Sequence, residues 1–394
     1  MLSREVEAGA EVPFAFEEHR GQHRPALYEY RPLLRAFVEK RESALRARPD
    51  AQLAIAELKR EPAAAIFARA HAGAKPSEAE ALFRTALLPL LVKTAEACGG
   101  FDWDDEAFAR AYTELERSLF GEQRSYGAVA PLIGISAVTQ VELGAEIRVR
   151  AAAAGELADH WPEANGLLPQ DFGHEPDRLC VLELQRALPP GAAEPPDAPG
   201  ELADAVTALR LATSAPVAAG PVLFERLDWR PFGIRPVLPI AATQPAGEPT
   251  RLDEFRSVLA RDLLTRLGAA DDDPELGEAL DRWELSLFQD EPFRSEQLRE
   301  SLAALLGGPD GLWAAAVRAS LLLGSTGSDR TKLLTSLRAL AGGERGSEQA
   351  GDAVRRALVE VVAHGSREQL LTRLDDALLG IAPRPVGYFA ARAA

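Results

Sequence analysis

The chain has 394 residues, of which 46% are hydrophobic, and its formal net charge is -16 at pH 7. This length allows two or three domains, and the acidic charge opposes general affinity for a nucleic-acid backbone, so DNA binding is not expected and RNA binding is disfavoured. Two widely separated cysteines and the lack of a long apolar run argue against a disulfide framework, secretion or membrane insertion, which favours a cytoplasmic protein.

The first 25 residues are polar and are interrupted by Pro13 and Gly21. We expect an arm with little regular structure here. His19 and His23 have the i, i+4 spacing of two metal ligands on one helix, but Gly21 falls between them and no third ligand is apparent. We therefore predict no metal site.

From residue 26 to residue 119, apolar residues recur with helical spacing. One such segment contains Leu33, Leu34, Phe37 and Val38, and a second contains Leu82, Phe83, Leu87, Leu90 and Leu91. The acidic run at 101–106 lacks the glycine bend and distal glutamate of a calcium loop, so Asp104 or Asp105 is better interpreted as a helix cap.

A change of period after residues 121–127 indicates a boundary and the start of strands. Ile147 and Val149 alternate with Arg148 and Arg150, as in a strand with one buried face. The two arginines either bind a phosphate or form the solvated face of the strand.

The rest of the middle segment combines a predicted buried strand, RLCVLELQRAL, with a Pro- and Gly-rich loop at residues 189–200. The pattern of AVTALRLAT fits either a strand or a short helix. Prolines between residues 221 and 239 confine that stretch to a sheet edge or an extended excursion. Arg226, Arg230 and Arg235 lie beside aromatic residues there, and they either stack on nucleotide bases or lie at the rim of an apolar contact.

The final third reads as successive capped helices. A helix with an apolar stripe is predicted from residue 251 to 267, and the next has Asp273 as its cap and Pro274 at its first position. Four more are expected at 295–306, 312–323, 329–340 and 352–363, and a fifth at 366–379. The 312–323 segment is apolar on nearly all sides, so it should lie at the centre of a bundle.

We therefore expect an α+β fold that is mainly helical, with a small β-rich middle region and a C-terminal helical bundle. The predicted domains are an N-terminal helical region at 1–127, a β-rich region at 128–250 and the bundle at 251–394.

The order of these elements, with the segments ALDRWELSLFQDEP, QLRESLAALLGG, GLWAAAVRASLLLG and VRRALVEVVAHGS, resembles the HEPN superfamily. Within it, the chain is similar to the ApeA-like HEPN proteins of prokaryotic defence systems, over roughly residues 128–380. Active members are metal-independent RNases whose motif is an arginine, often followed by a polar residue, then four to six residues and a histidine, and two copies usually meet across a dimer. The resemblance thus implies a HEPN-like bundle and assigns His364 to the histidine position.

The arginine of that motif departs from the family pattern. Arg356 is separated from His364 by seven residues and Arg355 by eight. On one straight helix Arg356 and His364 would lie roughly 12 Å apart along the axis. An alternative role for His364 is that of an imidazole at a helix C-terminus, where the exposed carbonyls favour positive charge.

The preferred hypothesis is a HEPN-like binding or scaffold component related to defence or stress systems, with a protein partner or self-association and no cofactor. The alternative is a metal-independent RNase in which Arg355 or Arg356 acts with His364. Motifs for nucleotide-binding P-loops, dinucleotide-binding folds, α/β-hydrolases and common zinc enzymes are missing from the sequence.

Overall fold

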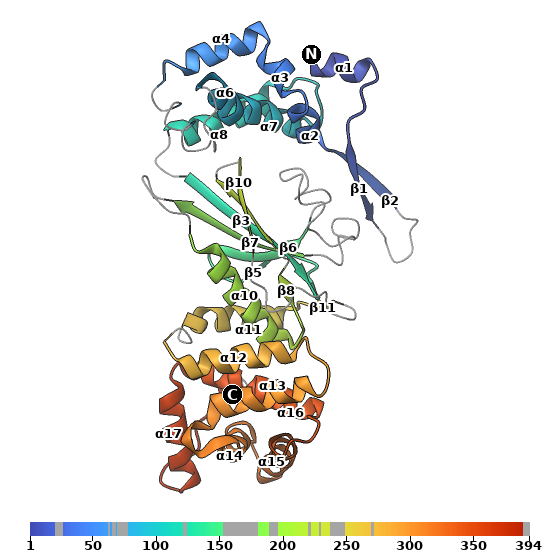
Figure 1. Ribbon diagram of the computed structural model, residues 1–394. Helices are drawn as coiled ribbons and strands as arrows, with labels where there is room; N and C mark the ends of the chain where they lie inside the picture. The colour runs from blue at the N-terminus through green and yellow to red at the C-terminus, as the bar shows by residue number, and fades with distance from the viewer. Residues whose placement is uncertain are drawn as a thin grey trace. The chain divides into compact units, whose positions relative to one another are not determined.

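The computed structural model describes residues 1–19, 27–61, 64, 68, 78–120, 124–152, 180–188, 196–219, 222–227, 230–236, 249–268 and 272–388, without the side chains of 15–19, 27–31, 78, 120, 124, 222, 227 and 230–236 (Figure 1). The chain forms two compact units. The first comprises Met1–Pro131, Ala151–Ala198 and Pro221–Val237, and the second comprises Leu132–Arg150, Pro199–Gly220 and Leu238–Ala394. The expected fold class is confirmed, because helices predominate and antiparallel strands occupy the middle of the chain. The compact units are built from discontinuous segments, and the three consecutive domains stay a prediction.

The N-terminal arm was expected to have little structure, and this was wrong. Helix α1 (Leu2–Glu7) precedes a hairpin of β1 (Phe14–His19) and β2 (Leu27–Pro32), with Phe14 opposite Pro32 and Phe16 opposite Tyr30. Alternation of aromatic and polar residues in FAFEEH and LYEYRP is the strand signal that explains the hairpin. His19 ends a strand, so the helical ligand spacing does not apply to it, and His23 lies outside the described residues.

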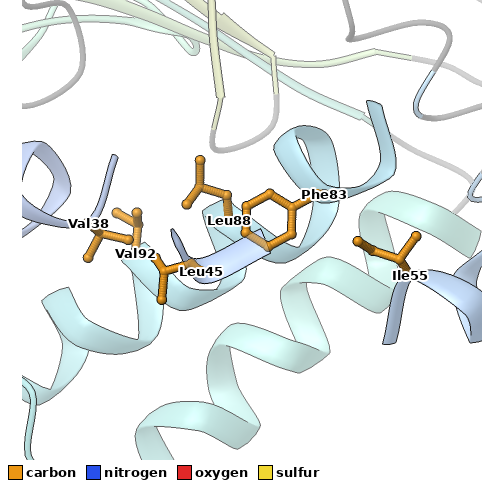
Figure 2. Close-up of a cluster of buried hydrophobic side chains, with 6 residues drawn as sticks. All are labelled: Val38, Leu45, Ile55, Phe83, Leu88 and Val92. Atoms are coloured by element: carbon orange, nitrogen blue, oxygen red, sulfur yellow. The ribbon is translucent and has the colours of Figure 1, made fainter. Parts of the chain in front are cut away.

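The helices of the first unit surround a small apolar core. They are α2 (Leu34–Glu39), α3 (Glu42–Arg46), α4 (Pro49–Leu58), α6 (Glu78–Leu82), the π-helical segment η1 (Phe83–Leu87), α7 (Leu88–Cys98) and α8 (Asp105–Phe120). Figure 2 shows the buried cluster formed by α2, α3, α4, η1 and α7, which consists of Val38, Leu45, Ile55, Phe83, Leu88 and Val92. Asp104 caps α8 by accepting hydrogen bonds from the backbone of Glu106 (2.8 Å) and Ala107 (3.3 Å), so the predicted cap is confirmed.

Pro89 explains the π-helical turn at Phe83–Leu87. A proline inside a helix has no N–H to donate, and its ring clashes with the carbonyl four residues earlier. The segment from α6 to α7 therefore widens into a π-helical turn directly before Pro89. This wide turn sets the directions of Phe83 and Leu87.

The strands of the first unit are paired in the order β10 (Arg230–Pro236), β9 (Val222–Leu227), β3 (Arg124–Ile133) and β7 (Cys180–Leu188). β7 is buried at its first five residues, as expected for RLCVLELQRAL. β10 contains Pro231 and Pro236 and is the end strand, with a register shift between Pro231 and Gly233. The predicted confinement of this proline-rich stretch to a sheet edge is confirmed for β10.

The second unit contains short strand pairs and a helix that the sequence left open. β11 (Thr250–Arg251) pairs with β4 (Ile135–Ser136), β5 (Val141–Glu142) pairs with β6 (Ile147–Ala151), and the end of β3 pairs with β8 (Ala218–Ala219). The segment AVTALRLAT belongs to α10 (Ala198–Thr213), so it is a helix. The predicted loop at 189–200 was therefore too long at its C-terminal end.

The C-terminal helices occur in the predicted order, with small shifts at their ends. They are α11 (Glu254–Leu267), α12 (Pro274–Ser286), α13 (Phe293–Leu306), the 3-10 turn η4 (Gly308–Asp310), α14 (Gly311–Leu323), α15 (Gly327–Ala341), α16 (Glu348–His364) and α17 (Arg367–Leu378). Asp273 caps α12 and Ser366 caps α17 through their side chains, as the sequence indicates. Thr326 and Asp329 form a full capping box on α15, which therefore begins earlier than residue 329.

Helix α16 is the centre of this bundle. It packs against α11, α12, α13, α14, α15 and α17, whereas α14 packs against α13, α15, α16 and α17. Ala353, Val354, Ala357, Leu358 and Val361 of α16 are all buried. The predicted central helix, α14, is largely buried but leaves Trp313 52% exposed.

Candidate functional site

His364, the predicted catalytic histidine, has both ring nitrogens occupied within the chain. It is the last residue of α16, and Gly365 ends the helix with a left-handed φ of 82°. Nδ1 donates to the backbone carbonyl of Ser366 (3.1 Å), and Nε2 accepts from Nη1 of Arg373 (3.1 Å). Because a carbonyl can only accept and a guanidinium can only donate, Nδ1 is the donor and Nε2 the acceptor in these two contacts.

His364 ends α16, as the alternative role at a helix C-terminus expects, and its charge there stays a prediction. The helix terminus is also complemented by the αL glycine and by Arg266, whose Nη1 donates to the carbonyl of Ala363 (3.0 Å).

The predicted arginine partners do not converge on His364. Arg355 donates from Nη2 to Asp352 Oδ1 (2.7 Å) and from Nη1 to the carbonyl of Leu211 (2.8 Å), so it ties α16 to α10. Its side chain is only 14% exposed. Arg356 is half-buried on the same continuous helix, two turns before His364. Arg355 and Arg356 thus remain separated from the imidazole, as their spacing indicates.

Arg373, on α17, is the arginine that sequence reasoning missed. It lies nine residues after His364, beyond a glycine and a helix cap, and the contact arises because α17 folds back beside α16. A motif search that looks for the arginine before the histidine has no means of finding it. The only signal was the short turn between two predicted helices, which brings their adjoining ends together.

Arg318 is the most heavily bonded side chain of the bundle. It donates to both carboxylate oxygens of Asp375 (2.7 and 2.8 Å), to Asp310 (2.8 Å), and to the carbonyls of Leu306 and Gly307 (2.9 and 2.8 Å). These carbonyls end α13 and have no partner within their own helix. The hydrogen bond to Asp375 is the main reason why the pKa of Arg318 is raised. All five donor bonds are used inside the fold, so Arg318 is not available to a ligand.

Arg210 and Glu284 form a buried ion pair between α10 and α12. Nη1 of Arg210 lies 2.5 Å from Oε2 of Glu284, and their side chains are 5% and 4% exposed. The hydroxyl of Thr207 donates to the other carboxylate oxygen (2.5 Å), and Nε of Arg210 donates to the carbonyl of Val217 (2.7 Å). Burial raises the pKa of Glu284, while Arg210 and Thr207 act in the opposite direction. This pair has no opening to solvent and positions helices.

Three of the five arginines proposed for nucleic-acid contact, Arg148, Arg150 and Arg226, have partners within the chain. On β6, Ile147 and Val149 are buried and Arg148 and Arg150 half-buried, which confirms the predicted alternation. Arg148 and Arg150 both have interaction partners in the chain. Arg226 donates to Oε1 of the buried Glu183 (2.9 Å).

Arg230 and Arg235 belong to β10, and their side chains lie outside the described residues. Nucleic-acid contact by the arginines at 148, 150, 226, 230 and 235 stays a prediction.

Two buried carboxylates of the first unit were not anticipated. Glu183 on β7 and Glu225 on β9 are each 1% exposed, and β3 lies between these strands. Tyr126 of β3 donates its hydroxyl to Oε1 of Glu225 (2.5 Å). The hydrogen bonds with Arg226 and Tyr126 help to make the burial of these two carboxylates tolerable.

Within the described residues, no three histidine, cysteine or acidic side chains are grouped so that they could hold a metal ion. Among the helices of that same part of the chain, none is both long and apolar enough to cross a membrane. Comparison with protein-family models, curated proteins and solved structures found no match to this chain.

Proposed function

We propose that the chain is a non-catalytic, HEPN-like binding or scaffold component of a cytoplasmic defence or stress system. The observation that carries this proposal is the closed hydrogen bonding of His364. A general acid or base needs a ring nitrogen that can reach the substrate. Here Nδ1 donates to the Ser366 carbonyl and Nε2 accepts from Arg373, so a substrate would first have to displace the guanidinium.

The hydrogen bonding of Arg355 also supports a non-catalytic role. An arginine that neutralises a reacting phosphate must present its guanidinium fork to solvent or substrate. The guanidinium of Arg355 donates to Asp352 and to the Leu211 carbonyl, and the second of these bonds stabilises the packing of α16 against α10. Holding two helices together in this way requires no catalytic activity.

An exposed apolar segment favours self-association. Leu378, Leu379 and Ile381 are 44%, 75% and 71% exposed and lie close together at the end of α17. Neighbouring exposed apolar side chains are typical of a protein contact. We propose that this segment forms part of the contact between two copies, the arrangement that the HEPN resemblance implies.

Sedimentation of the full chain tests the contact. The parent chain is expected to form a dimer, and Leu379→Asp with Ile381→Asp is expected to shift it to the monomer. Leu53→Asp is a matched control, because Leu53 is 66% exposed on α4 in the first unit. A parent chain that is monomeric at every concentration, or a dimer insensitive to both aspartates, refutes self-association through this segment.

The RNase alternative also has an observation in its favour. A guanidinium and an imidazole do meet in this bundle, although the guanidinium belongs to Arg373 instead of Arg355 or Arg356. If the pair opened to admit a phosphodiester, Arg373 could neutralise the phosphate while Nε2 of His364 accepted the 2′-hydroxyl proton. The relevant variants are therefore His364→Ala and Arg373→Ala.

The two functions are separated by incubating the purified chain with single-stranded RNA in EDTA. The scaffold proposal predicts that the parent chain leaves the RNA intact. Cleavage that disappears in His364→Ala and Arg373→Ala, but persists in Arg345→Ala, would overturn it in favour of the RNase. Arg345 is an exposed arginine of the second unit, so its loss matches the change in charge.

A further inference from the structure

The first unit contains a cavity of about 420 Å³ that the proposed function does not use. This volume falls in the range of small-molecule sites. Its walls come from α1, α4, η1, α7 and the turn that follows α7, and they are mostly leucine, alanine and phenylalanine side chains. The floor belongs to the buried cluster shown in Figure 2, through Leu45 and Phe83.

Two structural features keep this cavity in shape. The π-helical turn before Pro89 directs Phe83 and Leu87 to the cavity wall, and π-helical turns are frequent at functional sites. On the opposite side, the ion pair of Glu5 with Arg41 anchors α1, and the Arg41 guanidinium lies 3.4 Å from the centre of the Phe37 ring.

The charges at the mouth define which ligand fits. Arg48 and Asp50 form an ion pair with a 2.8 Å contact, so their charges offset each other. Asp102 is exposed, and Met1, whose α-ammonium is positive, is the other charged residue of the lining, so the charges balance overall. The negative charge lies next to Trp103 in the chain, and a cation placed there would be attracted by the Asp102 carboxylate.

An exposed tryptophan at the mouth adds a surface for a cation. Trp103 is 62% exposed, and its orientation is fixed because Nε1 donates to Asp105 (2.7 Å) and its ring packs 4.9 Å from that of Phe108. A fixed indole with an accessible face attracts organic cations, particularly quaternary ammonium groups. The carboxylate of Asp102 lies on the adjacent residue.

We propose that this cavity binds a small organic cation, with its apolar body among the leucine and phenylalanine side chains and its ammonium group at the mouth beside Asp102 and Trp103. The site lies wholly in the first unit and is independent of the residues around His364. If the cavity binds no cation, the scaffold proposal is unchanged. If the scaffold proposal fails, the cavity proposal is unchanged.

Three probes with the same eight-carbon chain test the proposal by calorimetry on the full chain: octyltrimethylammonium, 1-octanol and octanoate. The cation should bind about tenfold more tightly than octanol, because it adds an exposed cation–π contact and one surface charge pair. Octanoate should bind more weakly than octyltrimethylammonium, because its carboxylate cannot make the cation–π contact with Trp103. Equal binding of the three probes, tighter binding of octanoate, or no binding of any probe would overturn the proposal.

Cys98 supplies a second measurement that locates the bound probe. It lines the cavity and is half-buried, whereas the other cysteine, Cys180, is 1% exposed. A thiol reagent should therefore modify Cys98 first in the native chain. Octyltrimethylammonium should slow that modification at the concentrations at which it binds, and an unchanged rate would contradict binding in this cavity.

Three variants separate the cavity from its surroundings. Ala54→Trp should fill the cavity and abolish binding, whereas Ala56→Trp, on the same helix but outside the lining, should not. Asp102→Asn should reduce octyltrimethylammonium binding severalfold and leave octanol binding unchanged. Because Asp102 is on the surface, this variant tests the charge without disturbing the core. Equal losses for Ala54→Trp and Ala56→Trp would place binding elsewhere.

Discussion

Replacing Arg210 with methionine is the sharpest test of how the second unit is held together. Arg210 provides the only positive charge within hydrogen-bonding distance of the Glu284 carboxylate among the described residues. Methionine keeps most of the side-chain volume and removes the charge. The variant therefore leaves a carboxylate buried between α10 and α12 without its cation.

The expected cost follows from that geometry. Both side chains are at most 5% exposed, so solvent cannot replace the lost partner. Removing one member of a buried ion pair destabilises a protein by about 3–5 kcal/mol. A double variant, Arg210→Met with Glu284→Leu, leaves no buried charge and should recover more than half of that loss.

The loss of stability in Arg210→Met should depend on pH. Burial raises the pKa of Glu284 above its ordinary value of 4.5, and loss of Arg210 removes the main opposing influence. A carboxyl group with a raised pKa in the folded state binds a proton more readily there than in the unfolded chain. Stability therefore falls as pH rises from the ordinary to the raised pKa. The deficit of Arg210→Met should be largest near neutral pH and shrink as the pH approaches about 5.

Urea unfolding followed by tryptophan fluorescence measures these differences, because Trp283 and Trp313 both lie in the second unit. The parent, the single variant and the double variant are compared at neutral and mildly acidic pH. A single variant within about 0.5 kcal/mol of the parent at neutral pH would refute the reasoning, because that is the range of ordinary surface substitutions. So would a deficit that does not change with pH.

Four other substitutions, one of them a control, test the second unit by the same unfolding measurement. Gly365→Ala should lower the free energy of unfolding by about 1–2 kcal/mol, because φ is 82° there. The control Gly327→Ala, in a helical turn with open space around it, should be neutral or stabilising. Equal effects of the two variants would contradict the strain argument. Arg318→Lys should cost about 2–3 kcal/mol, since an ammonium cannot reproduce the five hydrogen bonds of the guanidinium, and a stability equal to the parent's would show that these bonds contribute little. Trp283→Ala should cost about 3–5 kcal/mol because the ring is 2% exposed, and a loss below 1 kcal/mol would mean that the bundle closes over the gap.

Much of the C-terminal bundle could be predicted from local chemistry. Asp273 before Pro274, and Ser366 after Gly365, signal helix ends through hydrogen bonds and φ angles that involve only neighbouring residues. Apolar stripes at helical spacing mark the buried faces, and Trp283 lies inside as its stripe indicates. Such signals fail where two local patterns compete, as for AVTALRLAT, whose alternating and helical periods overlap.

Neither the N-terminal hairpin nor the contacts of His364 could be predicted from such local signals. Phe14–His19 becomes a strand because Leu27–Pro32 pairs with it, and Gly21 and Pro25 in the sequence between them obscured the alternation. The contact of Arg373 with His364 depends on how α17 folds back beside α16, which no residue spacing encodes.

The sequence by itself determined which segments of the C-terminal bundle become helices, and where the caps of α12 and α17 lie, because these properties arise from interactions within a few residues. Tertiary structure alone decided which charges are buried together, as in Arg210 with Glu284, and which groups contact the two ring nitrogens of His364. The physical reason is that burial and pairing depend on groups far apart in the chain, whose approach is set by the packing of whole helices and strands.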